Sequence, residues 1–395
     1  MSQPAIQRAA IVGSGMLGAT IVHLSVTAGM SVVVKVRAAE GAVDRARAAL
    51  QSSLGREAKA GRLTPAEAQA APACARFTTD FADLAACDIV LEVIPELPDV
   101  KEAAFREIAA VVSRQCVIAS STSAISIAAL AACVPAPERV VGMHYFWPAY
   151  RRRLVEIAPH SGTSPAALRT AQAFAGAQHI RHIVTRDLPG FLTTRIFAAL
   201  LSEAIYAAGQ GASFDEIDRA MVAYGWQMGP FRLLDTISVD TMAKVYASLR
   251  ALLGERGAAL DVVTQLVAAG QLGRKSGAGF YRYDSDPPVP NPVALGLLPA
   301  QPRPAPAPEE LAHRITAMLV HEAAHCLAEG VVAGWPDVDV GASEGLAFPP
   351  SLGSVSQYVR ALGWQNFIDS LRGWEALYGS RFAATWLGRV PEPRA

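Results

Sequence analysis

The sequence has no excess of charge of either sign, since its 395 residues contain 35 basic and 35 acidic side chains. Nucleic acids and anionic membranes select basic surfaces, so this balance gives no electrostatic argument for either partner. The five cysteines are odd in number and scattered, without a CxxC pair, which is typical of a reduced protein. We therefore expect a cytoplasmic protein that has no nucleic-acid partner.

Long apolar runs are missing as well. The N-terminus reaches a short apolar strand at residues 8–12 without a basic region followed by an apolar one, so no signal peptide is predicted. The longest charge-free span, residues 115–137, carries five serine or threonine side chains. A buried strand, a polar turn and a short helix fit this span better than a membrane segment does.

A glycine-rich turn follows the first predicted strand. The strand of residues 8–12 leads into GSGMLG at 13–18, an apolar-periodic helix ends near Ala28, and a second strand follows at 31–36. This order is typical of a dinucleotide-binding unit, in which glycines allow a tight turn and let the backbone approach a pyrophosphate. The predicted cofactor contacts in this turn are Gly13, Gly15, Met16, Leu17 and Gly18.

The second strand lacks the acidic residue that usually binds the adenosine ribose. Lys35, Val36 and Arg37 stand at its end, where an aspartate or glutamate is expected. Without that carboxylate, and with Arg37 beside the gap, a 2′-phosphate is tolerated or preferred. We therefore expect NAD(P), with NADP(H) somewhat favoured by Val36 and Arg37. The alternative is a solvated Arg37 in a nucleotide site that has decayed.

Residues 40–72 are alanine-rich and helical in period, with an interruption near Gly61 and Pro65. The predicted structure is a helical hairpin that projects from the sheet as an arm. Its basic side chains, among them Lys59 and Arg62, are candidates for binding the phosphates of a substrate handle. A solvated helix face is the commoner explanation of such charges.

Alternation of strands and helices then resumes. The pattern predicts strands at 88–94 and 116–120 with a helix at 98–112 between them. The SSTS turn follows the carboxyl end of the second strand, where ligands sit in open parallel sheets. Ser123 is therefore a candidate substrate contact, although serine and threonine also favour helix caps for local reasons.

A histidine and a glutamate occupy the next two apolar runs. His144 ends the first run, and Glu156 lies twelve residues later in the second, so two neighbouring strands can bring the side chains together. A carboxylate behind an imidazole fixes its tautomer and stabilises the imidazolium, which makes the histidine a general base. The alternative is a histidine–glutamate pair with only a structural role.

Short motifs follow one another along nearly the whole chain: GSGMLG, LEVIPE with Glu96 and Lys101 five apart, ASSTS, MHYF, LVEI, PGF, MGPFRLLD and GRKSGAGFY. In this order and at these intervals they resemble the 3-hydroxyacyl-CoA dehydrogenases, and more closely the dehydrogenase part of multifunctional fatty-acid β-oxidation proteins. The resemblance implies that His144 is the catalytic base, Glu156 its partner and Ser123 a contact to the substrate. It also assigns Glu96 and Lys101 to the cofactor site.

Three asparagines expected from this resemblance are missing, and Trp147, Thr194 and Ser121 stand in their places. Threonine offers a single hydroxyl and tryptophan a single indole N–H, and the loss of one oxyanion donor costs about 10²–10³ in rate. We place Thr194 among the catalytic residues and Ser121 and Trp147 in an altered substrate pocket. The three arginines at 151–153 either bind an anionic substrate or form a solvated loop.

The chain after Leu188 is mostly helical and contains an internal repeat. Residues Arg195, Glu203 and Gly211 recur 119 positions later as Arg314, Glu322 and Gly330. We expect a Rossmann-like domain at 1–186, helical domains at 187–283 and 310–395, and a proline-rich extended linker at 284–309 between them. By resemblance this helical module is a dimer interface, so the chain is expected to be a monomer that satisfies its own interface, or a homodimer.

One metal-like pattern occurs in the second copy. His321, Glu322 and His325 spell HEAAH, the helical pattern of zinc hydrolases. The repeat already accounts for Glu322, which matches Glu203, and no convincing third ligand follows. We therefore expect no metal.

The resulting expectation is a doubly wound α/β domain followed by two related all-α domains. The resemblance implies hydride transfer between NAD(P) and C3 of a 3-hydroxyacyl or 3-ketoacyl thioester, with acyl-CoA as the substrate partner and no membrane partner. Two alternatives stay open, namely a relative that uses the His144–Glu156 pair for a non-redox lyase, dehydratase or cyclase step, and a non-catalytic acyl-CoA-binding relative.

Overall fold

The computed structural model describes residues 6–301 and 303–394. The chain divides into two compact units, the first ending at Leu188 and the second starting at Pro189. This boundary lies two residues from the expected one. The further division of the second part at residues 283 and 309 stays a prediction.

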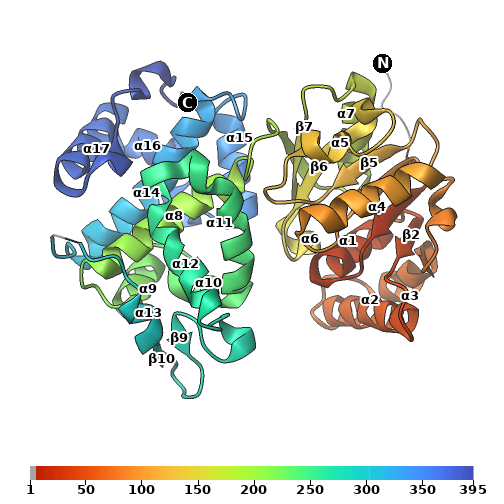
Figure 1. The fold of residues 1–395 in the computed structure, drawn as a ribbon, viewed down its shortest axis with the longest axis horizontal. Coiled ribbons are helices and arrows are strands. Elements are labelled where there is room, and N and C mark those ends of the chain that lie inside the picture. The colour runs from red at the N-terminus through yellow and green to blue at the C-terminus, as the bar shows by residue number, and fades with distance from the viewer. Residues whose placement is uncertain (1–5, 302, 395) are drawn as a thin grey trace. The chain divides into compact units, whose positions relative to one another are not determined.

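The first unit is an eight-stranded sheet with helices on both faces (Figure 1). The strand order is β3-β2-β1-β4-β5-β6-β7-β8, and neighbouring strands are parallel except for β6 and β7. The order reverses between β1 and β4, as in doubly wound sheets, so the predicted fold class is confirmed. The strands are β1 Ala9–Val12, β2 Val32–Lys35, β3 Ala75–Thr78, β4 Ile89–Glu92, β5 Val117–Ser120, β6 Val140–Tyr145, β7 Leu154–Pro159 and β8 Arg181–Val184.

The helices of this unit cover both faces of the sheet. Helices α1 and α7 share one apolar core with the strands, while α4 and α5 pack beside strands β4, β5 and β6. Every residue of β1, β4 and β5 is buried, as expected for parallel strands covered on both faces. The helices are α1 Met16–Thr27, α2 Ala42–Lys59, α3 Pro65–Ala70, α4 Pro98–Val111, α5 Ile127–Ala131, α6 Ala149–Arg152 and α7 Pro165–Ala177.

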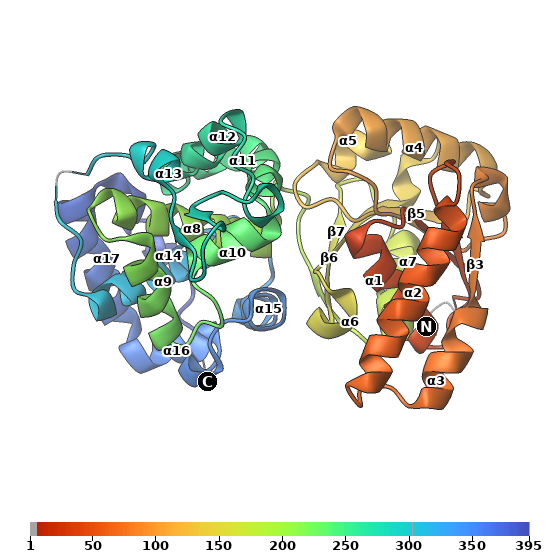
Figure 2. The ribbon, with the colours of Figure 1, turned by 90° about the horizontal axis from the view of Figure 1, so that it is seen from below.

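The expected arm consists of helices α2 and α3 (Figure 2). Thr64 and Glu67 form a capping box that begins α3, which satisfies two backbone donors at that end. The buried ring of His23 on α1 lies 2.8 Å from the hydroxyl of Ser53 on α2 and stacks on Tyr150 at 4.3 Å. The arm is therefore attached to the sheet domain by buried polar contacts.

The second unit is helical, as predicted. Helices α8 and α14 pack along each other (Figure 1) and carry the largest buried side chains of the unit, Arg195 and Arg314. The elements are α8 Thr193–Gly209, α9 Phe214–Ala223, α10 Pro230–Ile237, α11 Val239–Leu253, α12 Asp261–Ala268, β9 Tyr281–Arg282, β10 Val289–Pro290, α13 Pro292–Gly296, α14 Pro308–Ala328, α15 Trp335–Val340, α16 Val355–Leu362 and α17 Trp364–Tyr378.

The proline-rich segment is not extended throughout, which differs from the expectation. Strand β10 pairs antiparallel with β9, and the short helix α13 follows it. Asn291 explains both features, because its side chain caps α13 at the amide of Val293 and donates to the carbonyl oxygen of Gly279 at 2.7 Å. An asparagine among prolines was the signal for this turn.

No helix in the described part of the chain is both long and apolar enough to cross a membrane. The charge-free span of residues 115–137 forms strand β5, a turn and the short helix α5, as expected.

Candidate active site

At two positions of the glycine turn between β1 and α1, the neighbouring backbone leaves no room for a side chain. A Cβ atom on Gly13 would lie 2.4 Å from the carbonyl oxygen of Val93, and one on Gly18 would lie 2.1 Å from that of Gly13. Gly15 is the N-cap of α1, and no atom of the described residues lies within 4 Å of the position that a Cβ would take there. The first amides of α1 are therefore open to an anion such as a pyrophosphate.

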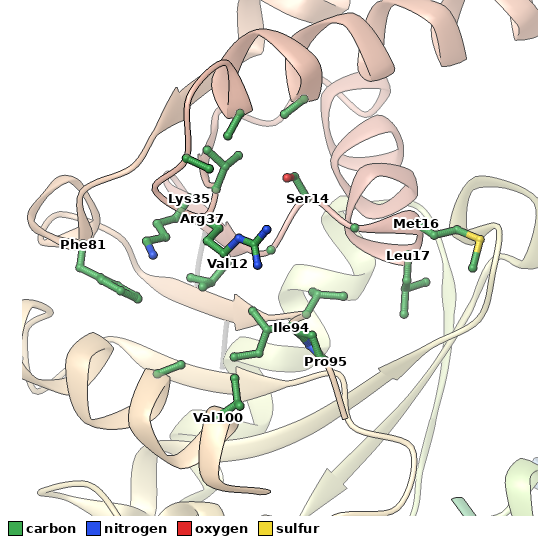
Figure 3. A pocket seen from close by; sticks show the side chains of 18 of the residues that line it. Val12, Ser14, Met16, Leu17, Lys35, Arg37, Phe81, Ile94, Pro95 and Val100 are labelled. Carbon is green, nitrogen blue, oxygen red and sulfur yellow. The ribbon is translucent and has the colours of Figure 1, made fainter. Parts of the chain in front are cut away.

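A cavity of about 1270 Å³ lies over this turn, at the carboxyl ends of β1, β2 and β4. It opens where the strand order reverses, which is the ligand position of doubly wound sheets. Figure 3 shows Arg37 pointing into it, with Phe81 and Val100 on the surrounding walls. The predicted cofactor residues that line it are Gly13, Gly15, Met16, Leu17, Val36 and Arg37.

The adenosine side of the cavity carries basic groups and no acid at the position of Val36. Lys35 lies 3.9 Å from the centre of the Phe81 ring, and burial lowers its pKa. Arg45 from α2 also lines the cavity and donates to the carbonyl oxygen of Glu40 at 2.9 Å. The residues present fit a dinucleotide, and Val36 and Arg37 stand where a ribose-binding carboxylate is usual.

The predicted cofactor residues Glu96 and Lys101 have other partners. Lys101 is only 1 % exposed and lies 2.7 Å from a Glu92 oxygen, whereas Ser120 donates to the other oxygen of Glu92 at 2.6 Å. Lys101 also lies 3.4 Å from Glu96. Sequence reasoning missed Glu92, although a carboxylate inside the apolar strand at 88–94 was the available signal.

Glu96 holds the SSTS turn in place. One of its carboxylate oxygens accepts from the Thr122 hydroxyl at 2.5 Å and from the Ser123 amide at 2.9 Å. Bonds to an ionised acceptor are stronger than neutral ones, so Glu96 orients the turn that carries Ser123. The predicted substrate contact Ser121 is buried, and its hydroxyl accepts from the Tyr145 amide at 3.4 Å.

His144 and Glu156 are directly paired residues of the antiparallel strands β6 and β7. The Nδ1 atom of His144 lies 2.7 Å from a Glu156 oxygen, and Nε2 lies 3.1 Å from the Ser123 hydroxyl. His144 is 6 % exposed and Glu156 is fully buried. A carboxylate at Nδ1 keeps the proton on that nitrogen and leaves Nε2 as the acceptor, so the three side chains form one proton-transfer line.

The other predicted substrate residues lie on surfaces. Trp147 follows β6 and is 54 % exposed. Lys59 is exposed, and Arg62 makes two hydrogen bonds to Glu57, at 2.6 and 3.0 Å. Glu57 also accepts from Arg151 at 2.7 Å, so one of the three arginines at 151–153 joins the arm to α6 and is not free for an anionic substrate.

Thr194 lies in the first turn of α8, in the second unit, and is partly buried. Its predicted catalytic role stays a prediction.

The HEAAH histidines do not face a common ligand. His321 lies 2.9 Å from the carbonyl oxygen of Ala383, His325 packs on Trp386 at 3.7 Å, and Glu322 is bound by arginines. Within residues 6–301 and 303–394, no group of three or more His, Cys, Asp or Glu side chains is arranged to hold a metal ion.

A doubly wound sheet with a cavity over a glycine turn at its switch point defines a dinucleotide-binding domain, and the same sheet carries the histidine–glutamate pair on β6 and β7. Family models agree. Residues 8–188 match the NAD binding domain of 3-hydroxyacyl-CoA dehydrogenase, and residues 190–283 match its C-terminal domain. The chain therefore belongs to the 3-hydroxyacyl-CoA dehydrogenase family.

Relatives and solved structures extend the match. The fatty acid oxidation complex subunit alpha of Shewanella amazonensis is 34 % identical over 385 residues, which are 96 % of this chain and 54 % of that protein. The chain thus spans about half the length of the curated relatives it matches. The 3-hydroxybutyryl-CoA dehydrogenase of Escherichia coli covers 98 % of both chains at 25 % identity and a TM-score of 0.84. The (S)-3-hydroxybutyryl-CoA dehydrogenase PaaH1 of Ralstonia eutropha is 34 % identical, covers 71 % of this chain and all of its own, and has a TM-score of 0.67.

Proposed function

We propose that this protein transfers hydride between a nicotinamide cofactor and C3 of a 3-hydroxyacyl or 3-ketoacyl thioester, with coenzyme A as the substrate handle. The observation that carries the proposal is the line from Glu156 to His144 to Ser123, with distances of 2.7 and 3.1 Å. A bound nicotinamide supplies the hydride acceptor or donor.

In the oxidative direction Nε2 of His144 takes the proton of the C3 hydroxyl. Glu156 holds the ring and stabilises the imidazolium that forms. The Ser123 hydroxyl, already within reach of Nε2, hydrogen-bonds the reacting oxygen. In the reductive direction His144 returns the proton to that oxygen.

We further propose that the cofactor site accepts NADP(H) at least as well as NAD(H). Val36 removes the carboxylate that would repel a 2′-phosphate, and Arg37 points into the cavity (Figure 3). Lys35 and Arg45 also line this cavity. An arginine fork binds phosphate in a charge-assisted, two-point contact. A clear preference for NADH in a binding titration would refute this.

The test of the main proposal is oxidation of NADH and NADPH with acetoacetyl-CoA and a panel of bulkier and anionic 3-ketoacyl thioesters. Turnover with any thioester supports it, whereas absence of nucleotide binding at millimolar concentration excludes it. If nucleotide binds but acetoacetyl-CoA is inert, the Trp147→Asn, Thr194→Asn double variant should gain activity, because both amides of the family pattern return.

A non-redox use of the same base is the second candidate. Trp147 favours it, because an exposed indole stands where the family pattern has an amide. Release of water or a cleaved product from a 3-hydroxyacyl thioester without any nucleotide would identify this candidate.

A further inference from the structure

Two clusters of buried charge in the second unit are built from matching positions of the internal repeat. Arg195 and Glu203 of α8 correspond to Arg314 and Glu322 of α14 at an offset of 119. The same offset matches Gln210, just after α8, with Glu329, just after α14. The repeat therefore places a carboxylate in one cluster where the other has a neutral amide.

In the first cluster charges balance. Arg195 lies 2.6 Å from Glu322 and 2.7 Å from Glu329. Arg256, from the 3₁₀ turn after α11, lies 2.6 Å from the other oxygen of Glu322. Two guanidinium groups thus meet two carboxylates.

In the second cluster charges do not balance. Arg314 lies 2.9 Å from Glu203, and Arg381, from the 3₁₀ turn after α17, lies 2.8 Å from the other Glu203 oxygen. Gln210 gives Arg314 only its amide oxygen, at 2.7 Å. Two guanidinium groups therefore share one carboxylate, and among the described residues no second carboxylate contacts either of them.

Among the described residues, four donors of this second cluster have no hydrogen-bond partner: Arg314 Nε and Nη1, Arg381 Nη2 and Gln210 Nε2. Arg314 Nε and the Glu203 oxygen 2.9 Å from it form an ion pair without hydrogen-bond geometry. Arg314 is fully buried, while Arg381 and Gln210 are 6 % and 7 % exposed. Ring faces of Tyr378 and Tyr206, at 4.4 and 4.1 Å, face the two guanidinium groups. They attract a cation less than a carboxylate does. Unpaired donors next to an uncompensated buried charge are costly and point to an ion or water that belongs in the cluster.

We propose that the second cluster binds one small monovalent anion of the halide class, such as chloride, in the role that the Glu329 carboxylate plays in the first cluster. A water molecule would satisfy the donors but would leave the excess positive charge buried. The donors are closed to solvent, which favours a small anion over a large one.

The proline-rich segment explains why the second cluster is closed to solvent while the first is not. The Ala305 amide donates to the Gln210 carbonyl oxygen at 3.1 Å, and a Cβ on Gly209 would lie 2.1 Å from the Pro299 carbonyl oxygen. Glu329 at the matching end is 35 % exposed. Solvent can therefore reach the first cluster beside its carboxylate, whereas the segment covers the second.

The first experiment is thermal unfolding of the full chain in sodium gluconate, with chloride added at constant ionic strength. We expect a saturable rise of the unfolding temperature on the order of 5 °C. The Gln210→Glu variant supplies the missing carboxylate and should unfold at a higher temperature without chloride and gain nothing from it. The control variant Gln265→Glu makes the same charge change at an exposed position on α12 and should keep the full chloride response.

Two further observations complete the test. Glu329→Gln should weaken the first cluster and add a second chloride response. A crystal grown in bromide should show one anomalous peak between Arg314, Arg381 and Gln210. The proposal is overturned if chloride does not change the wild-type unfolding temperature or if the bromide crystal shows no peak at this place. It is also overturned if Gln210→Glu responds to chloride as the wild type does, or if Gln265→Glu loses the response.

Discussion

The guanidinium group of Arg195 lies 2.6 Å from the carboxylate of Glu322, and neither side chain is exposed. The repeat makes this contact reciprocal, because Arg314 of the second copy lies 2.9 Å from Glu203 of the first. Each copy therefore supplies the cation for the other copy's anion. Removing one partner of a buried ion pair leaves the other charge uncompensated and is strongly destabilising.

Glu322→Gln should lower the free energy of unfolding by about 3–5 kcal/mol, because Arg195 and Arg256 lose the carboxylate they share. Denaturant unfolding measures this loss. The control Glu309→Gln changes an exposed carboxylate on the same helix and should cost less than about 1 kcal/mol. Equal losses in the two variants would contradict the importance of the crosswise pairs.

Reciprocal pairing within one chain favours a monomer. Light scattering coupled to size-exclusion chromatography should give a mass near 41.6 kDa at micromolar concentration. A mass twice as large would show that the two copies do not replace a dimer interface.

His144→Asn should lower kcat by about 10²–10⁴ with little change in unfolding temperature, since it removes the general base. Glu156→Gln should lower kcat as well, because the amide no longer fixes the proton on Nδ1. His179→Asn is the matched control: His179 is exposed, and its φ of 56° suits asparagine. Steady-state rates of the three variants decide the assignment, and full activity of His144→Asn would refute it.

Arg37→Ala should weaken NADPH binding by about 10–100-fold and leave NADH binding nearly unchanged, because only NADPH carries the 2′-phosphate that pairs with the guanidinium. Val36→Asp should weaken NADPH and strengthen NADH. Arg47→Ala, an exposed change on the same arm, serves as the control in fluorescence titrations. Equal effects on both nucleotides would place the adenosine ribose away from Arg37.

The lowered pKa of Glu57 makes the folding stability of the protein depend on pH. Hydrogen bonds from Arg62, with support from Arg151, lower the pKa of Glu57 from 4.5 to about 2. A carboxyl group with a lowered folded pKa adds stability above its unfolded pKa, and this stability is lost as pH falls from about 4.5 toward 2. Both arginines are about half exposed, so solvent screening limits the contribution to about 1–2 kcal/mol.

Glu57→Gln should therefore lose about 1–2 kcal/mol at pH 7 and show a flatter stability profile below pH 4.5 than the wild type. Urea unfolding between pH 7 and 3 measures both effects. The exposed Glu40→Gln should reproduce the wild-type profile, and an unchanged profile in Glu57→Gln would mean that the arm is held by other contacts.

Much of the first unit was predictable because its signals are local. Three local signals predicted the order of elements: glycines that the backbone requires, short apolar runs and the helical period of the arm. The pairing of His144 with Glu156 followed from their spacing, whereas strands β2 and β4 end one and two residues before the predicted ends. The fold of the proline-rich segment was not predictable from composition, because the side chain of Asn291 sets it through contacts with backbone groups twelve residues away.

The sequence by itself determined the family, the dinucleotide unit and the pairing of His144 with Glu156, since each is a pattern of residue types at fixed intervals. The tertiary structure decided which charged side chains pair with one another. It gave Arg62 and Arg151 to Glu57, Lys101 to Glu92, and Glu96 to the turn of Ser123. Within the described residues, it also left Arg314 and Arg381 with one carboxylate between them. These pairings depend on distance and burial in the folded chain, and no interval in the sequence specifies them.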